Sequence, residues 1–151
     1  MYELHAVAHK MVEKNKGILA ADESNPTCTK RFESIDVEST AESRNLYRSI
    51  LFSSKDIEKY ISGVILFDET FHQSELSSSL KIPEYLSSKD ILPGIKVDGG
   101  LENFGSNEKL TIGLDGLSER LGKYYSLGAR FAKWRAVITP GNGTPTDECI
   151  L

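Results

Sequence analysis

The segment Gly17-Ile18-Leu19-Ala20-Ala21-Asp22-Glu23-Ser24 begins as an apolar run and ends in two acids and a serine. Apolar residues at successive positions are typical of a strand that is buried on both faces, as in a parallel sheet. The same pattern recurs in residues 63–70, where Gly-Val-Ile-Leu-Phe is followed by two acids and a threonine. The two segments therefore predict buried parallel strands that carry polar residues at their carboxyl-terminal ends.

Two later segments follow the same design. Residues 93–100 predict a third strand with charged residues at its end, and residues 131–138 predict a fourth. Because side chains alternate along a strand, Lys133 and Arg135 share one face of the fourth strand. Burying a lone cation is costly. Two cations on one face of an apolar strand therefore indicate an anionic partner, supplied by the fold or by a ligand.

Helical patterns separate these strands. Apolar residues recur at helical spacing in residues 4–12 and 114–125, and the second of these helices is expected to end at Gly128. A further helix is expected to begin at Thr146.

Ser39 and Glu42 have the spacing of a capping box and predict that another helix begins there. Its expected apolar stripe consists of Leu46, Tyr47, Ile50 and Leu51. The remaining segments are expected to be irregular: Asn25-Pro26-Thr27 as a turn, residues 74–90 as a loose helix or loop, and residues 101–112 as a loop over the strand ends.

Strands that begin near residues 17, 62, 94 and 130 thus alternate with helical or loop segments. This alternation predicts a parallel α/β architecture with right-handed crossovers. Both a doubly wound sheet and a (β/α)8 barrel fit, because each binds ligands at the carboxyl-terminal ends of its strands. The first strand is followed by no glycine-rich phosphate motif, which weighs against a Rossmann or P-loop fold. A closed barrel needs eight β/α units and about 250 residues, whereas this chain has about four units.

The composition is that of an ordinary soluble globular domain, with 151 residues, 39% hydrophobic and 26% charged. The net charge of −4 argues against a nucleic-acid partner bound through bulk charge. No apolar run is long enough to span a membrane, and the first residues lack the pattern of a secretory signal. Cys28 and Cys149 are expected to be reduced thiols, with a disulfide as the less favoured alternative.

His5 and His9 lie one helical turn apart, which is a spacing that metal sites use. A zinc site of this kind also needs a glutamate beside the first histidine and a third ligand, whereas Ala6 follows His5 here. The sequence therefore favours two histidines that flank a core stripe and predicts no metal site.

Charged and polar side chains are expected to converge at one end of the sheet. They are Asp22, Glu23, Ser24, Asp68, Glu69, Lys96, Asp98, Lys133 and Arg135. Acids beside lysines suit chemistry on a phosphorylated carbonyl compound, because a lysine can attack the carbonyl to form an iminium and a carboxylate can transfer protons. From charge alone the alternatives stay open, since acids at strand ends are often helix caps and a lysine within a strand can be a paired structural ion.

Five segments resemble class I fructose-bisphosphate aldolase in both order and spacing. They are Gly-Ile-Leu-Ala-Ala-Asp-Glu-Ser (17–24), Gly-Val-Ile-Leu-Phe-x-Glu-Thr (63–70), Gly-Ile-Lys-Val-Asp (94–98), Gly-Leu-Asp-Gly-Leu (113–117) and Phe-Ala-Lys-Trp-Arg (131–135). The resemblance implies that residues 1–151 are the amino-terminal part of a single (β/α)8 barrel domain, a half barrel without a second domain. It also implies reversible cleavage of fructose 1,6-bisphosphate to dihydroxyacetone phosphate and glyceraldehyde 3-phosphate in an enzyme that is usually oligomeric. That reaction uses a lysine Schiff base and neither a metal nor a cofactor.

The resemblance implies roles for individual residues as well. Asp22 is expected to act as the acid beside the Schiff base, with Lys96 and Lys133 as active-site cations. Lys133 is expected near the C4 hydroxyl and the carboxylate that handles the proton. The residues expected to bind the substrate or its phosphates are Ser24, Thr27, Arg31, Arg44 and Arg135.

Two positions depart from the family pattern. Asn25-Pro26-Thr27 replaces the usual Thr-Gly-Ser, which removes a backbone N–H and the flexibility of glycine, and Gly99 replaces a lysine. The larger departure is length, because the Schiff-base lysine and the acid/base glutamates of the family lie on later strands. We therefore expect this polypeptide alone to be inactive or nearly so. The alternative is a non-catalytic half barrel that binds sugar phosphate weakly or only self-associates. The expected compartment is the cytoplasm.

Overall fold

The computed structural model describes residues 4–151 and contains a four-stranded parallel sheet. In spatial order its strands are β1 (Gly17–Ala21), β2 (Ile61–Leu66), β3 (Leu92–Lys96) and β6 (Phe131–Lys133). One register row crosses all of them through Ala20, Ile65, Gly94 and Phe131. Each strand of this sheet lies beside the previous one, as in a β/α barrel, so the predicted fold class is confirmed for this part of a barrel.

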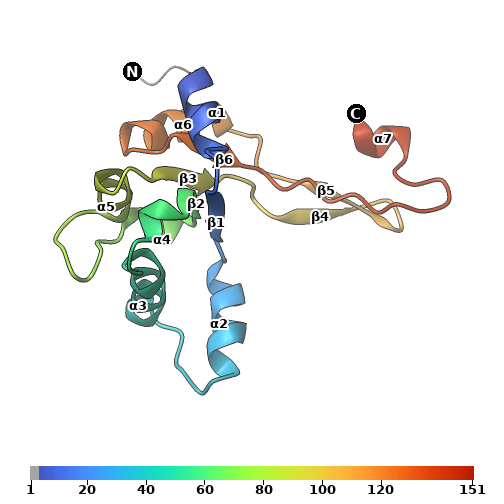
Figure 1. Ribbon diagram of the computed structural model, residues 1–151. Coiled ribbons are helices and arrows are strands. Elements are labelled where there is room, and N and C mark those ends of the chain that lie inside the picture. Colours follow the sequence, from blue (N-terminus) through green and yellow to red (C-terminus); the bar gives the residue numbers. More distant parts are fainter. Residues whose placement is uncertain (1–3) are drawn as a thin grey trace.

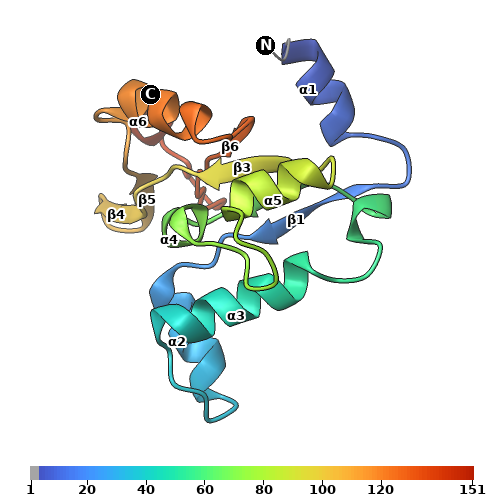
Figure 2. The same ribbon diagram turned by 90° about the vertical axis from the view of Figure 1, so that its left-hand side faces the viewer.

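Helices precede, connect and follow the strands. They are α1 (Leu4–Met11), α2 (Asn25–Glu33), α3 (Ala41–Phe52), the 3-10 turn η1 (Ile57–Lys59), α4 (Asp68–His72), α5 (Ile82–Ser88), α6 (Leu117–Ser126) and α7 (Asp147–Ile150). Helices α3, α4 and α5 lie together on one side of the sheet (Figures 1 and 2). Within residues 4–151, no helix is long and apolar enough to cross a membrane.

The hydrophobic core lies between the sheet and these helices. Its main strand residues are Ala21, Val64, Leu66 and Ile95, and its main helix residues are Phe52, Phe71 and Leu86. Each of these side chains is at most 2% exposed. The alternation of side chains along a strand directs every second residue into this core, so the helix side of the sheet is well packed.

The opposite face of the sheet is only partly covered. Ile18 is 41% exposed, and Ala20 is also exposed. The ring of Phe131 lies over Gly94, where an added Cβ would come within 2.3 Å of the ring. The prediction that the first and fourth strands are buried on both faces is therefore wrong for this chain, because the helices cover one face only.

The segment predicted to be a loop over the strand ends is an antiparallel hairpin instead. Strand β4 (Leu101–Phe104) pairs with β5 (Glu108–Thr111), and Gly105 begins the turn with a positive φ of 56°. The hairpin extends away from the sheet beside the chain that follows β6 (Figure 1). Thr111 Oγ1 donates a hydrogen bond to the carbonyl oxygen of Arg135 at 2.7 Å. Most side chains of the hairpin are polar, so the sequence lacked the apolar alternation that identifies a strand.

The capping box of α3 lies one residue later than predicted. Thr40 Oγ1 accepts from the backbone N–H of Ser43 at 3.1 Å, and Ser43 Oγ accepts from the N–H of Thr40 at 2.9 Å. Ser39 and Glu42 therefore do not form the box. The hydroxyl of Ser39 instead accepts a hydrogen bond from Arg44 at 3.1 Å.

The apolar stripe predicted for α3 is wrong in part. Leu46 and Ile50 are 51% and 61% exposed, whereas Arg48 is 2% exposed. The helix therefore turns an arginine toward the protein interior in place of two aliphatic side chains. Arg48 faces the interior because it pairs there with Glu23.

Two boundaries also differ from the predictions. Asn25-Pro26-Thr27 is the first turn of α2 rather than an isolated turn, and a proline is tolerated there because its missing N–H would have no partner within the helix. The fourth strand ends at Lys133 rather than near residue 138. The predicted helices in residues 4–12 and 114–125 and the predicted helix start at Thr146 are confirmed within a few residues.

Candidate active site

The strand ends form a cleft of about 540 Å³. The residues that line it are Asp22, Glu23, Ser24, Pro26, Thr27, Phe67, Lys96, Asp98, Gly99, Gly100, Lys133 and Arg135. They follow or end β1, β2, β3 and β6, which is where a β/α barrel binds its ligands. Six of the eight predicted site residues lie in this cleft, and only Arg31 and Arg44 do not.

A lysine–aspartate pair spans the cleft. Lys133 Nζ donates to Asp22 Oδ2 at 2.8 Å. Asp22 follows β1 and Lys133 ends β6, so the pair joins the two outer strands of the sheet. The two side chains are 28% exposed for Lys133 and 14% exposed for Asp22, and water screens their attraction only partly. Asp22 is therefore an anionic partner of the kind predicted for the cations of the fourth strand.

A second pair lies at the end of β3. Lys96 Nζ donates to Asp98 Oδ1 at 2.7 Å and to the carbonyl oxygen of Asp98 at 2.9 Å. Burial has the largest effect on this carboxyl group and opposes its ionisation. The hydrogen bond from Lys96 and the charges of Lys96 and Lys133 together outweigh burial and hold the pKa of Asp98 below its usual value. Asp98 is therefore ionised at neutral pH.

Two hydroxyl groups face the cleft from the beginning of α2. Ser24 Oγ and Thr27 Oγ1 lie 3.1 Å apart, and Ser24 is the residue before the helix without capping it through its side chain. The amino-terminal end of a helix favours negative charge. This corner of the cleft therefore combines two hydrogen-bonding groups with a weakly positive helix end.

The two predicted site residues outside the cleft are held by ion pairs beside it. Arg44 donates from Nε and Nη2 to the two oxygens of Glu69, each at 2.7 Å. This bidentate contact is the main reason that the pKa of Glu69 is lowered. Arg31 contacts Glu23 and Tyr47. The roles predicted for Arg31 and Arg44 stay predictions.

A buried arginine that the sequence did not single out lies behind the end of β1. Arg48 Nη2 lies 3.0 Å from Glu23 Oε2 and donates to the carbonyl oxygen of Glu23 at 2.9 Å. Its guanidinium also lies 5.0 Å from the centre of the Tyr47 ring. A detectable signal was the spacing of Arg44, Arg48 and Leu51 along one side of the helix, because an arginine within a buried stripe requires an acidic partner.

Residues 4–151 contain no group of three or more histidine, cysteine, aspartate or glutamate side chains placed to bind a metal ion. His5 and His9 are exposed on α1. Cys28 is a buried free thiol and Cys149 a partly buried one.

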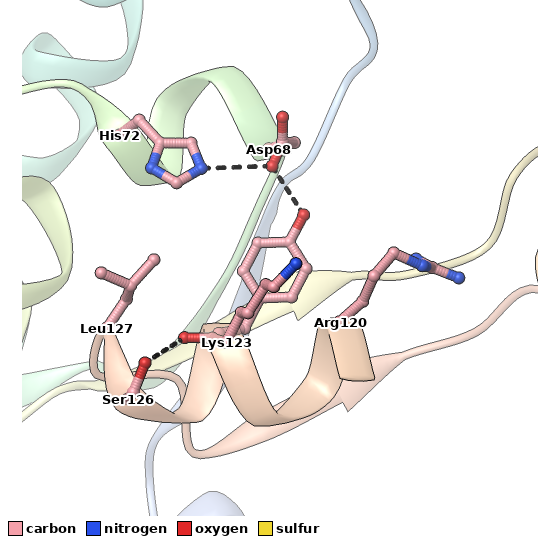
Figure 3. Close-up of a pocket in the computed structure, with 7 residues that line it drawn as sticks. Asp68, His72, Arg120, Lys123, Ser126 and Leu127 are labelled. Carbon is pink, nitrogen blue, oxygen red and sulfur yellow. Dashed lines mark hydrogen bonds and ion pairs between the residues drawn. The ribbon is translucent and has the colours of Figure 1, made fainter. Parts of the chain in front are cut away.

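A second pocket of about 380 Å³ lies between α4 and α6 (Figure 3). The hydroxyl of Tyr124 donates to Asp68 at 2.6 Å, and His72 lies 3.4 Å from the same carboxylate. Burial and then the hydrogen bond to Asp68 raise the pKa of Tyr124 to about 12. Asp68 was expected to converge with the other charged residues at the strand ends, but it lines this pocket instead, and neither Asp68 nor Glu69 lines the cleft. None of the residues predicted to be catalytic or to bind substrate lines this pocket, so the cleft at the strand ends is the candidate active site.

Parallel strands joined by helices, with lysines and carboxylates converging at their carboxyl-terminal ends, define a protein of the β/α-barrel class. A comparison with protein families narrows this class. The model of glycolytic class I fructose-bisphosphate aldolase matches residues 3–151. The chain therefore belongs to the class I fructose-bisphosphate aldolase family.

Individual relatives agree with this assignment. Fructose-bisphosphate aldolase 1 of Toxoplasma gondii is 53% identical and is matched over 98% of this chain and 42% of its own length. A probable fructose-bisphosphate aldolase class 1 of Xylella fastidiosa is 47% identical, with 98% and 45% covered. A solved structure of the Plasmodium falciparum aldolase, in complex with TRAP and a small-molecule inhibitor, superimposes with a TM-score of 0.91 at 49% identity, covering 97% of this chain and 43% of that one. The chain thus spans less than half the length of these relatives.

Proposed function

We propose that this chain supplies the first strand ends of an active site that reversibly cleaves fructose 1,6-bisphosphate into dihydroxyacetone phosphate and glyceraldehyde 3-phosphate. The observation that carries the proposal is the meeting of the Asp22–Lys133 and Lys96–Asp98 pairs in one cleft at the ends of β1, β3 and β6. Family membership and the names of the relatives support it.

In this reaction Asp22 stabilises the positive charge of an iminium formed by a lysine from a later strand. Its partner Lys133 balances the negative charge of Asp22 before the substrate enters, because a carboxylate that is partly removed from water needs a counter-charge. When substrate is bound, Lys133 donates a hydrogen bond to the C4 hydroxyl. Both side chains keep some contact with water. Lys133 can therefore change partners without leaving a fully buried charge unpaired.

The substrate's negative charges are bound by the remaining groups of the cleft. Lys96 and Arg135 are cations that line it, and Ser24 and Thr27 offer hydroxyl groups at the amino-terminal end of α2. Hydrogen bonds from charged donors to phosphate are about twice as strong as neutral ones. Binding of a phosphorylated sugar is therefore the part of the function that this chain can perform by itself.

Calorimetric titration of this chain with fructose 1,6-bisphosphate tests the proposal. Lys133→Met is expected to weaken binding by about tenfold or more, because it removes a charged donor and leaves Asp22 to repel the substrate. Lys59→Met is the matched control, since Lys59 is an exposed lysine paired with Asp56 at 3.2 Å and does not line the cleft. Equal affinity of the Lys133→Met variant and the wild type would contradict the proposal.

Borohydride reduction in the presence of dihydroxyacetone phosphate tests the assignment of the nucleophile. Because Lys96 and Lys133 are proposed as supporting cations, we expect neither to form a covalent adduct in this chain. An adduct on either lysine, located by peptide mass spectrometry, would show that it attacks the carbonyl and would overturn these roles.

We further propose that the full-length enzyme is an oligomer that acts in the cytoplasm. The alternative for this chain is a non-catalytic half barrel that binds sugar phosphate weakly or only self-associates, and the exposure of Ile18 and Ala20 on the open face of the sheet favours some association. Sedimentation across a range of protein concentrations, with and without fructose 1,6-bisphosphate, separates the two. Association without any sugar-phosphate binding would support the alternative.

A further inference from the structure

The pocket between α4 and α6 is separate from the cleft at the strand ends (Figure 3). Its volume of about 380 Å³ lies within the range of about 300 to 1,000 Å³ that is typical of small-molecule sites. The residues that line it are Asp68, His72, Arg120, Lys123, Tyr124, Ser126 and Leu127. None of them lines the cleft. The pocket is therefore a second concavity, built by two helices on the outer side of the sheet.

Hydrogen bonds fix the polar end of this pocket. The hydroxyl of Tyr124 donates to Asp68 Oδ1 at 2.6 Å, and His72 Nε2 lies 3.4 Å from the same oxygen. Because the pKa of Tyr124 is raised to about 12, its hydroxyl remains a donor at neutral pH. The negative charge of Asp68 is thus stabilised from within the protein, and it repels a nearby anion less than an unpaired carboxylate would.

Arg120 brings a positive charge to the pocket from the first half of α6. Its guanidinium donates to the carbonyl oxygen of Val97 at 3.1 Å and to that of Gly113. These oxygens carry no net charge, so the two bonds hold the guanidinium in place without neutralising it. Burial has the largest effect on the pKa of Tyr124 and raises it, whereas the charge of Arg120 lowers it. The field of Arg120 therefore reaches the side chains of the pocket.

Lys123 supplies a second cation. It pairs with Glu119 at 2.8 Å, but the two side chains are 70% and 73% exposed. A surface pair of this kind contributes little free energy, so Lys123 can turn to a bound anion at small cost. Figure 3 shows Lys123 extending from α6 toward the side on which α4 carries Asp68 and His72. The permanent charges that line the pocket are thus two cations and one anion, which favours a ligand with a single negative charge.

The wall of the pocket offers an apolar surface. The ring of Tyr124 is held by an edge-to-face contact with Phe71 at 5.4 Å between ring centres. Leu127 follows α6 and is 48% exposed, which leaves part of an aliphatic side chain in water. A flat apolar group placed against these two side chains would remove their surface from water. An aromatic body therefore suits this wall better than a bare inorganic anion does.

We propose that the pocket between α4 and α6 is a second ligand site, which binds a small aromatic carboxylate. The aromatic ring packs against Tyr124 and Leu127, and the carboxylate accepts a hydrogen bond from Lys123 within the field of Arg120. A single negative charge fits this arrangement, because a dianion would meet stronger repulsion from Asp68. The site does not depend on the proposed function, since it shares no lining residue with the cleft.

Titration calorimetry with 2-naphthoate tests the proposal, and 2-naphthamide is the matched neutral probe with the same ring system. We expect 2-naphthoate to bind about tenfold more tightly than the amide, because hydrogen bonds to a charged group are stronger than neutral ones. Lys123→Met should reduce this preference to about threefold or less. Lys59→Met is the control, because Lys59 is also an exposed lysine in a short-range pair and does not line the pocket. Leu127→Gln should weaken the binding of both probes by about threefold.

The backbone amide resonances of α4 and α6 locate the bound probe, and competition with fructose 1,6-bisphosphate separates the pocket from the cleft. A preference for 2-naphthoate that falls in Lys123→Met but not in Lys59→Met supports the site. Equal affinity for the two probes, absence of binding, or displacement of 2-naphthoate by fructose 1,6-bisphosphate would overturn it. Lys133→Met alters the cleft and should leave 2-naphthoate binding unchanged, so this site and the proposed function can fail separately.

Discussion

The two faces of the four-stranded sheet differ in how fully their apolar side chains are buried. On the helix face, Val64, Leu66 and Ile95 are 0% exposed. On the open face, Ile18 is 41% exposed and Phe131 is only partly buried. The helix face is thus completed by elements of this chain alone, whereas the open face shows apolar residues to water.

Unlike the exposed apolar residues of the open face, its charged groups have partners within the chain. Asp22 and Lys133 meet at 2.8 Å, and Lys96 and Asp98 meet at 2.7 Å. The polar end of this face therefore has its partners within the chain, although the apolar middle lacks its cover. A β/α barrel needs a packed helix layer for stability and suitably placed strand ends for its site. In this chain the two features lie in different parts of the sheet.

The largest effect is expected from truncation on the helix face. Leu66→Ala should lower the free energy of unfolding by about 3 kcal/mol, because it removes buried contacts and leaves a cavity among closely packed side chains. Urea denaturation should show a lower midpoint with an unchanged slope. A loss below about 1 kcal/mol would mean that the helix face is not the main source of stability.

An intermediate effect on the free energy of unfolding is expected from the ionisation of Tyr124, which joins α6 to α4 on the helix side. Its pKa is raised to about 12 from 10.0, chiefly by burial and then by its hydrogen bond to Asp68. A raised pKa in the folded state favours the neutral form, so the contribution is complete below pH 10 and is lost as the pH rises through about 12. Because the side chain keeps partial contact with water, the loss should be near 1 kcal/mol.

Tyr124→Phe checks this pH dependence, since phenylalanine preserves the ring contact with Phe71 at 5.4 Å and cannot ionise. The free energy of unfolding should fall more steeply between about pH 10 and 12 in the wild type than in the variant. Parallel curves for the two proteins would show that the hydroxyl of Tyr124 is not coupled to folding.

The smallest effect is expected on the open face. Ile18→Ala removes an aliphatic side chain comparable to that of Leu66, but the side chain is 41% exposed and leaves no closed cavity. The free energy of unfolding should change by less than about 1 kcal/mol. A loss as large as that of Leu66→Ala would show that this face is covered in solution. Sedimentation would then identify whether a second copy of the chain provides the cover.

The parallel strands could be predicted from the sequence because apolar runs that end in charged residues are typical of such strands. Asp22, Lys96 and Lys133 could also be placed in one site, since the carboxyl ends of neighbouring parallel strands meet at one end of a sheet. The register row and the cleft confirm this arrangement of positions. The chemical roles of these residues stay predictions.

Sequence-based prediction failed where a local pattern depended on a distant partner. The hairpin of β4 and β5 consists of polar residues that pair with each other, and polarity alone indicates a loop. The predicted inward face of α3 was wrong in part because Arg48 contacts Glu23, which lies 25 positions earlier in the chain. Neither effect appears in the periodicity of a single segment.

The Lys133–Asp22 pair also constrains the order in which the protein folds. Its two residues are 111 positions apart in the chain, so Asp22 leaves the ribosome long before its partner has been synthesised. Contacts between distant residues form late, because closing a long loop costs conformational entropy. Strands β1, β2 and β3 and the helices between them contain most of the core residues, whereas the cleft is complete only when Lys133 has joined Asp22. The addition of β6 is therefore the step that completes the cleft.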